Sequence, residues 1–96
     1  MKVRKYANAF EFVGFPPGEA EHLRIRADLM IELERLIRAR ELTQAQAAKL
    51  LKVSQPRVSD LLRGKIDRFS IDTLVDMLTV AGADVKVTVR RRKSAA

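Results

Sequence analysis

Residues 42–65, with the sequence LTQAQAAKLLKVSQPRVSDLLRGK, constrain the fold of this 96-residue chain more than any other stretch. Thr43 and Gln46 have the spacing of a capping box, in which each side chain bonds a free backbone N–H at the start of a helix. Apolar residues follow at helical spacing. We therefore predict a short helix over about 44–51.

A second helix start follows almost at once. Ser54 is a favoured N-cap residue, and Pro56 falls in the first turn, where a missing N–H costs nothing. Gly64 tolerates the left-handed backbone conformation that ends many helices. These signals predict a helix over about 55–62. The link between the two helices is so short that they must cross steeply.

The two predicted helices carry the residues that a close crossing requires. Ala47 and Ala48 are small enough for close packing, and Val53 can fill the corner of the turn. Val58 and Leu61 predict the buried face of the second helix. The residues left for its outer face can all form hydrogen bonds: Gln55, Arg57, Ser59 and Asp60. A purely structural αα-hairpin does not need this polar face, so the pattern favours a DNA-binding helix-turn-helix.

Single positions can be given roles in DNA binding. The second helix of such a motif enters the major groove N-terminus first, which places Gln55, Arg57 and Ser59 to read bases. Gln can pair with adenine, and Arg with guanine, through two hydrogen bonds each. Gln44 begins the first helix and can bond a phosphate together with free N–H groups. Three flanking cations are predicted to contact further phosphates: Lys52, Arg63 and Lys65.

The rest of the chain predicts a helix bundle, all-α apart from one short strand. Apolar residues recur at helical spacing over about 19–40, which is the longest predicted helix. Ser70 caps a last helix that ends at Gly82. We expect three parts: an irregular segment over 1–18, a helical DNA-binding domain over 19–82 with the helix-turn-helix at 43–64, and a strand with a basic tail over 83–96.

The hydrophobic period changes near the C-terminus. Val85, Val87 and Val89 alternate with polar residues, which predicts a half-buried strand. A lone strand leaves its backbone N–H and C=O groups unpaired. We expect it to pair with the same strand of a second copy, making these valines a dimer strand, or with the sheet edge of a partner. A frayed tail is the structural alternative.

Charge and composition narrow the classes of function. The net charge is +7, of which +4 lies within residues 43–69, and a basic protein attracts polyanions such as nucleic acid. The chain has no Cys, and His22 is its single His, so neither a metal set nor a nucleophile set can be assembled from them. We therefore expect no enzyme, no cofactor and no metal. No apolar run approaches the roughly 20 residues of a membrane span, and the N-terminus lacks the apolar core of a signal peptide, which predicts a cytoplasmic protein.

The stretch TQAQAAKLLKVSQPRVSDLLRGK resembles the lambda-repressor-like, XRE-type helix-turn-helix family. With the flanking EFVGFPPGEA, RADLMIELERLI and KIDRFSIDTLVDMLTVAGADVKV, the resemblance covers about residues 8–90. Within the family, the chain is similar to the HigA-like subgroup of antitoxins and transcriptional regulators. The resemblance implies a lambda-repressor-like bundle and a homodimer on a palindromic operator. Six positions match DNA-facing sites of the family: Gln44, Ser54, Gln55, Pro56, Arg57 and Ser59. Lys52 departs from the family, whose turn usually carries Gly at this position.

The resemblance leaves several functions open. The first is an antitoxin that binds a small ribonuclease toxin and represses the shared operon. The N-terminal segment, with its aromatic residues Tyr6, Phe10, Phe12 and Phe15, and the C-terminal strand are candidate toxin contacts. Those aromatics can equally cover the helical core. A stand-alone or phage-type repressor is the second function. An RNA-binding or adaptor protein is the third, although aromatics make up only 5% of the chain and no stacking platform is visible.

Overall fold

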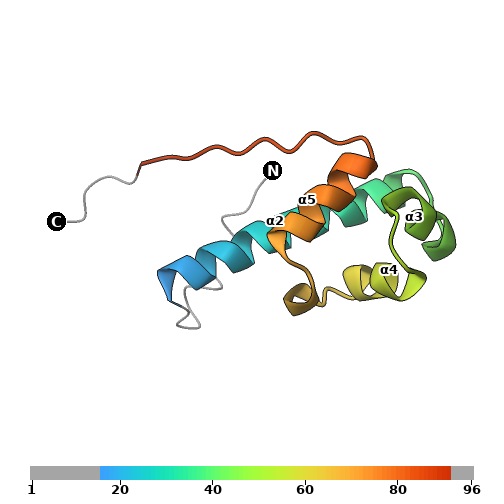
Figure 1. Ribbon diagram of the computed structural model, residues 1–96, viewed down its shortest axis with the longest axis horizontal. Helices are drawn as coiled ribbons and strands as arrows, with labels where there is room; N and C mark the ends of the chain where they lie inside the picture. Colours follow the sequence, from blue (N-terminus) through green and yellow to red (C-terminus); the bar gives the residue numbers. More distant parts are fainter. Residues whose placement is uncertain (1–15, 92–96) are drawn as a thin grey trace.

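The computed structural model describes residues 16–91, which fold as a small helical bundle (Figure 1). Its elements are α2 (Pro17–Ala39), α3 (Gln44–Leu51), α4 (Gln55–Leu62), the 3-10 turn η1 (Ile66–Arg68) and α5 (Ile71–Val80). The prediction of an all-α fold is confirmed for this part of the chain. The candidate toxin contacts Tyr6, Phe10, Phe12 and Phe15 lie outside the described residues.

The long helix α2 is the spine of the bundle. It begins at Pro17, two residues before the predicted start, because Pro is favoured in a first helical turn where its missing N–H has no partner to lose. Glu19 in the first turn and Arg38 in the last turn complement the helix dipole. The backbone then leaves the helix through Glu41, whose φ of 52° is left-handed. α5 packs along α2, and α3 and α4 lie at its C-terminal end (Figure 1).

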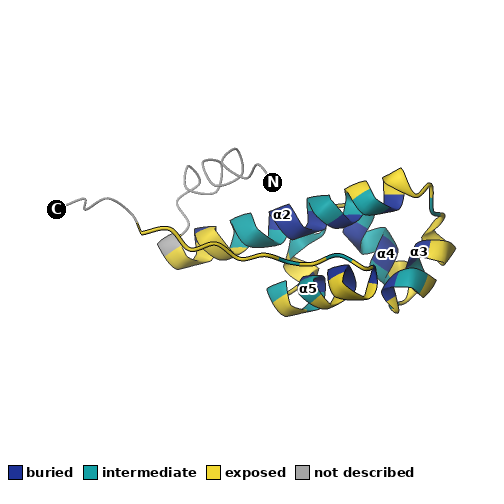
Figure 2. Cartoon of the chain, turned by 90° about the horizontal axis from the view of Figure 1, so that it is seen from above, coloured by how far each residue is buried: buried dark blue, intermediate teal, exposed yellow. Residues whose placement is uncertain are grey.

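The core is built from one face of each helix. Figure 2 shows this inward face as a buried stripe between exposed surfaces. Leu33 of α2 and Leu74 of α5 are fully buried at its centre, and Ala47 of α3 and Val58 of α4 meet them. The predicted contacts of the helix pair are therefore confirmed for Ala47, Val58 and Leu61. Phe69, in the link between α4 and α5, is also buried and was not anticipated as a core residue.

The predicted C-terminal strand is wrong for this chain in isolation. Residues 83–91 run back along α2 as an extended segment without strand pairing (Figure 1). Val85 is half-buried against the core, but Val87 and Val89 are 80% and 90% exposed. A strand exists only through hydrogen bonds to a neighbour. No other described segment of the chain lies beside it as a strand.

Candidate nucleic-acid interface

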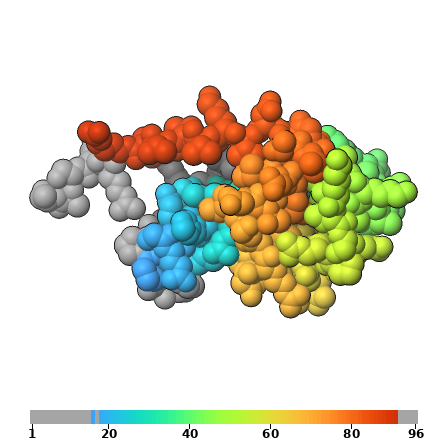
Figure 3. All heavy atoms as spheres, in the orientation of Figure 1, coloured from blue at the N-terminus to red at the C-terminus, as the bar shows by residue number. Residues whose placement is uncertain are grey.

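The helix pair α3 and α4 forms the surface that the sequence assigned to DNA. Both predicted helices are confirmed with the expected bounds, Gln44–Leu51 and Gln55–Leu62. In Figure 3 they occupy one end of the molecule, and the extended C-terminal segment runs along the opposite edge from α4. The surface is thus separate from the segment in which dimer pairing is expected.

The capping box at the start of α3 is present in full. The Gln46 backbone N–H donates to the Thr43 hydroxyl at 3.1 Å, and the Thr43 N–H donates to the Gln46 side-chain oxygen at 2.9 Å. Gln44 follows directly and is exposed. Because the cap uses the N–H groups of Thr43 and Gln46, the N–H groups between them are left for a phosphate.

The turn between the helices contains a conformational cost. Lys52 has φ of 57° and ψ of 42°, the left-handed conformation in which Gly is usually preferred. Its N–H still bonds the carbonyl of Lys49 at 3.4 Å, so the turn is closed as it would be with Gly. A Lys at this position strains the backbone modestly but places a cation at the edge of the surface. The side chain of Lys52 is exposed.

The N-terminal turn of α4 is the most accessible part of the motif. The Ser54 hydroxyl accepts the Arg57 N–H at 3.4 Å, which confirms the predicted cap. Ser54, Gln55 and Pro56 are exposed, whereas Ser59 is half-buried. Of the predicted phosphate contacts in this region, Arg63 is exposed and Lys65 is half-buried. A ligand that approaches this end therefore meets Gln55 first among side chains that can read a base.

Arg57 does not lie free on this surface. Its guanidinium carbon is 4.3 Å from the centroid of the Phe69 ring, and its Nη1 donates to the Arg68 carbonyl at 2.8 Å. Arg68 in turn donates to the Asp60 carboxylate at 3.1 Å. Base reading by Arg57 stays a prediction, but in this structure its guanidinium contacts Phe69 and the Arg68 carbonyl. The sequence analysis did not identify Phe69 and Arg68 as partners of Arg57. The one available signal was a large aromatic residue, Phe69, between Gly64 and Ser70.

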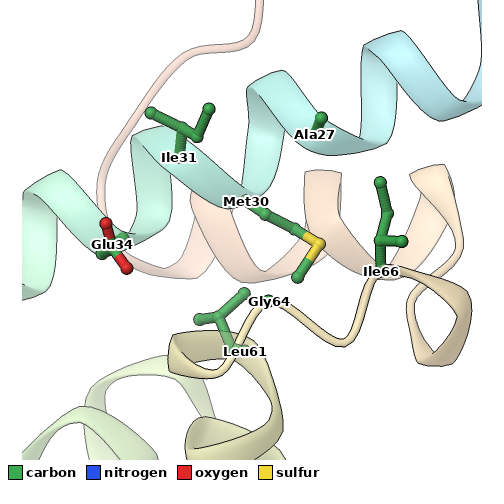
Figure 4. Close-up of a pocket in the computed structure, with 7 residues that line it drawn as sticks. All are labelled: Ala27, Met30, Ile31, Glu34, Leu61, Gly64 and Ile66. Atoms are coloured by element: carbon green, nitrogen blue, oxygen red, sulfur yellow. The ribbon is translucent and has the colours of Figure 1, made fainter. Parts of the chain in front are cut away.

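A shallow apolar cavity of about 360 Å³ separates α2 from the end of α4 (Figure 4). Met30 of α2 points toward Leu61 and Ile66 across it, and Ile31 and Glu34 also line it. The Glu34 carboxylate is 3.7 Å from Arg38. This cavity lies behind α4, away from its exposed first turn.

One buried carboxylate lies outside the interface. Asp28 of α2 is 4% exposed, and its Oδ1 has no hydrogen-bond partner among the described residues. Burial raises the pKa of Asp28 above its usual range, and Arg24, 3.9 Å from the other carboxylate oxygen, opposes this shift. The ionised form of Asp28 is therefore costly in the folded state.

Within residues 16–91, no cluster of His, Cys, Asp and Glu is arranged to hold a metal ion. In the same range, no helix combines the length and the apolar character of a membrane span.

Two capped helices packed together across a short turn, with the first turn of the second helix exposed, define a helix-turn-helix domain. The family model described as "Helix-turn-helix domain" matches residues 12–90 of the chain. A solved structure labelled an XRE family transcriptional regulator is similar over 81% of this chain and 91% of its own length, with 32% identity and a TM-score of 0.74. No curated protein matches the sequence significantly. The chain belongs to the XRE helix-turn-helix family.

Proposed function

We propose that the chain is a sequence-specific DNA-binding transcriptional regulator. The observation that carries this proposal is the exposed first turn of α4, with Ser54 as its cap and Gln55 and Pro56 at its tip. The structural similarity to an XRE family transcriptional regulator supports the same function. The net charge of +4 over residues 43–69 supplies the sequence-independent attraction to DNA.

The residues of the surface divide into two roles. Gln55 and its neighbours on the first turn of α4 face the bases, where an amide can pair with adenine. Gln44 and the cations Lys52, Arg63 and Lys65 contact phosphates and fix the register of the domain on the duplex. Ser59, one turn further along α4, has a shorter side chain and makes a polar contact at the edge of the groove.

The operator is proposed to be palindromic and the protein a homodimer. The extended segment over 83–91 supports this, since it pairs with no strand within residues 16–91 and carries two exposed valines, Val87 and Val89. Pairing of this segment with its copy would form an antiparallel ribbon that includes Val85. Because the segment lies on the opposite edge from α4, pairing through it would leave α4 uncovered (Figure 3).

A narrower proposal is that the regulator is the antitoxin of a toxin–antitoxin pair and represses its own operon. It rests on the resemblance of the sequence to HigA-like antitoxins. A stand-alone repressor shares the same DNA-binding surface and lacks only the toxin. The two are separated by expressing the tagged protein in its native operon and asking whether a small neighbour co-purifies in stoichiometric amount. A homodimer that purifies without a neighbour, yet binds its own promoter, would reject the antitoxin role.

The regulator itself is tested with DNA from its own promoter. A labelled promoter duplex is titrated with the protein in the presence of excess unrelated duplex. The proposal predicts a complex that survives this competition. A complex that unrelated duplex removes as readily as unlabelled promoter DNA would show that the protein does not read sequence.

A further inference from the structure

The link between α4 and α5 is held by arginines from both sides. Arg26 of α2 donates to the Ile66 carbonyl at 3.3 Å. Arg57 of α4 donates to the Arg68 carbonyl at 2.8 Å. The Arg68 side chain then returns to Asp60 of α4 at 3.1 Å. The second and third contacts both join α4 to Arg68, in opposite directions.

The guanidinium of Arg57 makes two contacts with the protein. Its central carbon lies over the ring of Phe69, a residue that is 1% exposed and belongs to the core. An Arg that reads guanine must point its fork of N–H donors at the base in the groove. Here one donor of that fork bonds a backbone carbonyl, and the guanidinium carbon lies over an aromatic ring. Arg57 is therefore tied to the bundle core.

These contacts fix the orientation of α4. Arg57 lies in its first turn and Asp60 in the next, so both project from adjacent positions on one side of the helix. Two contacts at different positions along α4 resist both rotation of the helix about its axis and tilting of the helix against the core. Base recognition needs its side chains held to about 0.5 Å and 10–20°. The exposed residues Gln55 and Pro56 are one or two positions from the first of these contacts.

We propose that Arg57 is a positioning residue, which sets the angle at which α4 presents Gln55 to DNA through its contacts with Phe69 and the Arg68 carbonyl. Asp60 and Arg68 form the second half of the same device. This inference rests on the proposed function, because an angle of α4 has a consequence only if α4 enters a groove. On this proposal, the base specificity comes from the side chains that Arg57 holds in place and not from Arg57 itself.

The test compares base preference position by position. The preferred duplex is selected from random DNA with the wild-type protein, and every single-base-pair variant of it is then measured. Arg57→Ala and Asp60→Asn are compared with wild type and with Arg63→Ala, an exposed cation at the end of the same helix. Circular dichroism and thermal unfolding report whether each variant is folded. If Arg57→Ala does not fold, Arg57→Lys carries the test, since it keeps a cation over the ring but lacks the planar fork.

Positioning predicts that both Arg57→Ala and Asp60→Asn flatten the preference over several adjacent base pairs. The ratio of preferred to unrelated binding is expected to fall by roughly tenfold for Arg57→Ala. Arg63→Ala is expected to weaken binding to all sequences alike. If Arg57→Ala loses preference at one base pair only, while Asp60→Asn matches wild type, Arg57 reads a base and the inference is overturned. If wild type selects no sequence, the proposed function itself fails.

Discussion

The salt dependence of DNA binding can be worked out from the cations on the α3–α4 surface. Three cations of each subunit are proposed to contact phosphates, Lys52, Arg63 and Lys65, so the proposed dimer presents six. Every neutralised phosphate contributes about −0.9 to the slope of log affinity against log salt. The predicted slope is therefore about −5, and affinity for the operator falls roughly 10³-fold between about 50 and 200 mM salt.

Arg63→Ala removes two of these contacts per dimer. We expect the slope to change to about −3.5, with the same loss of affinity on operator and on unrelated DNA. Fluorescence anisotropy of a labelled duplex over a salt series measures both quantities. Arg35→Ala is the matched control, because Arg35 is an exposed cation of α2, bonded to Glu32 at 3.1 Å, and has no assigned phosphate. If Arg63→Ala leaves the slope unchanged, or if Arg35→Ala lowers it equally, the assignment of phosphates to this surface is refuted.

Three further predictions concern the fold and the dimer. Thr43→Ala removes the acceptor of the capping box and should cost about 1 kcal/mol, which lowers Tm by roughly 4–8 °C, while Gln44→Ala, in the same turn but outside the capping box, should not. Because the folded-state pKa of Asp28 is raised, the protein loses stability as pH rises from the ordinary pKa of an Asp to the raised pKa of Asp28. Asp28→Asn should therefore increase Tm at pH about 7 and match the wild-type Tm below pH about 4. Equal Tm values of variant and wild type at both pH values would contradict this. Truncation before Asp84 should weaken the proposed dimer in sedimentation, and a dimer that truncation leaves unchanged would reject the ribbon.

Much of the fold could be predicted because each helix start depends on hydrogen bonds between residues close together in the sequence. Thr43 with Gln46, Ser54 and Ser70 each bond a backbone N–H within three residues, so the sequence spacing alone locates them. The left-handed turn at Lys52 could also be predicted, because the family usually has Gly at this position. The observed φ of 57° is a conformation that Gly adopts more easily than other residues.

The remaining features depend on residues that are far apart or on another molecule. The hydrophobic alternation of Val85, Val87 and Val89 correctly indicated extended backbone, but a strand needs a neighbour that this chain does not supply within its described residues. The base-reading role of Arg57 was predicted from the polar face of an isolated helix. Its contact with Phe69 depends on how the link after α4 folds back over that helix, and helical periodicity carries no information about that.

Selection from a library of random duplexes tests the proposal that α4 reads DNA sequence. We predict that wild-type protein enriches a palindrome whose half-sites are separated by about one helical turn, roughly 34–36 Å, or a multiple of it. Gln55→Ala, under the same selection, should lose the preference at one position in each half-site. Enrichment of no sequence by wild type, or an unchanged preference in Gln55→Ala, would contradict the proposal.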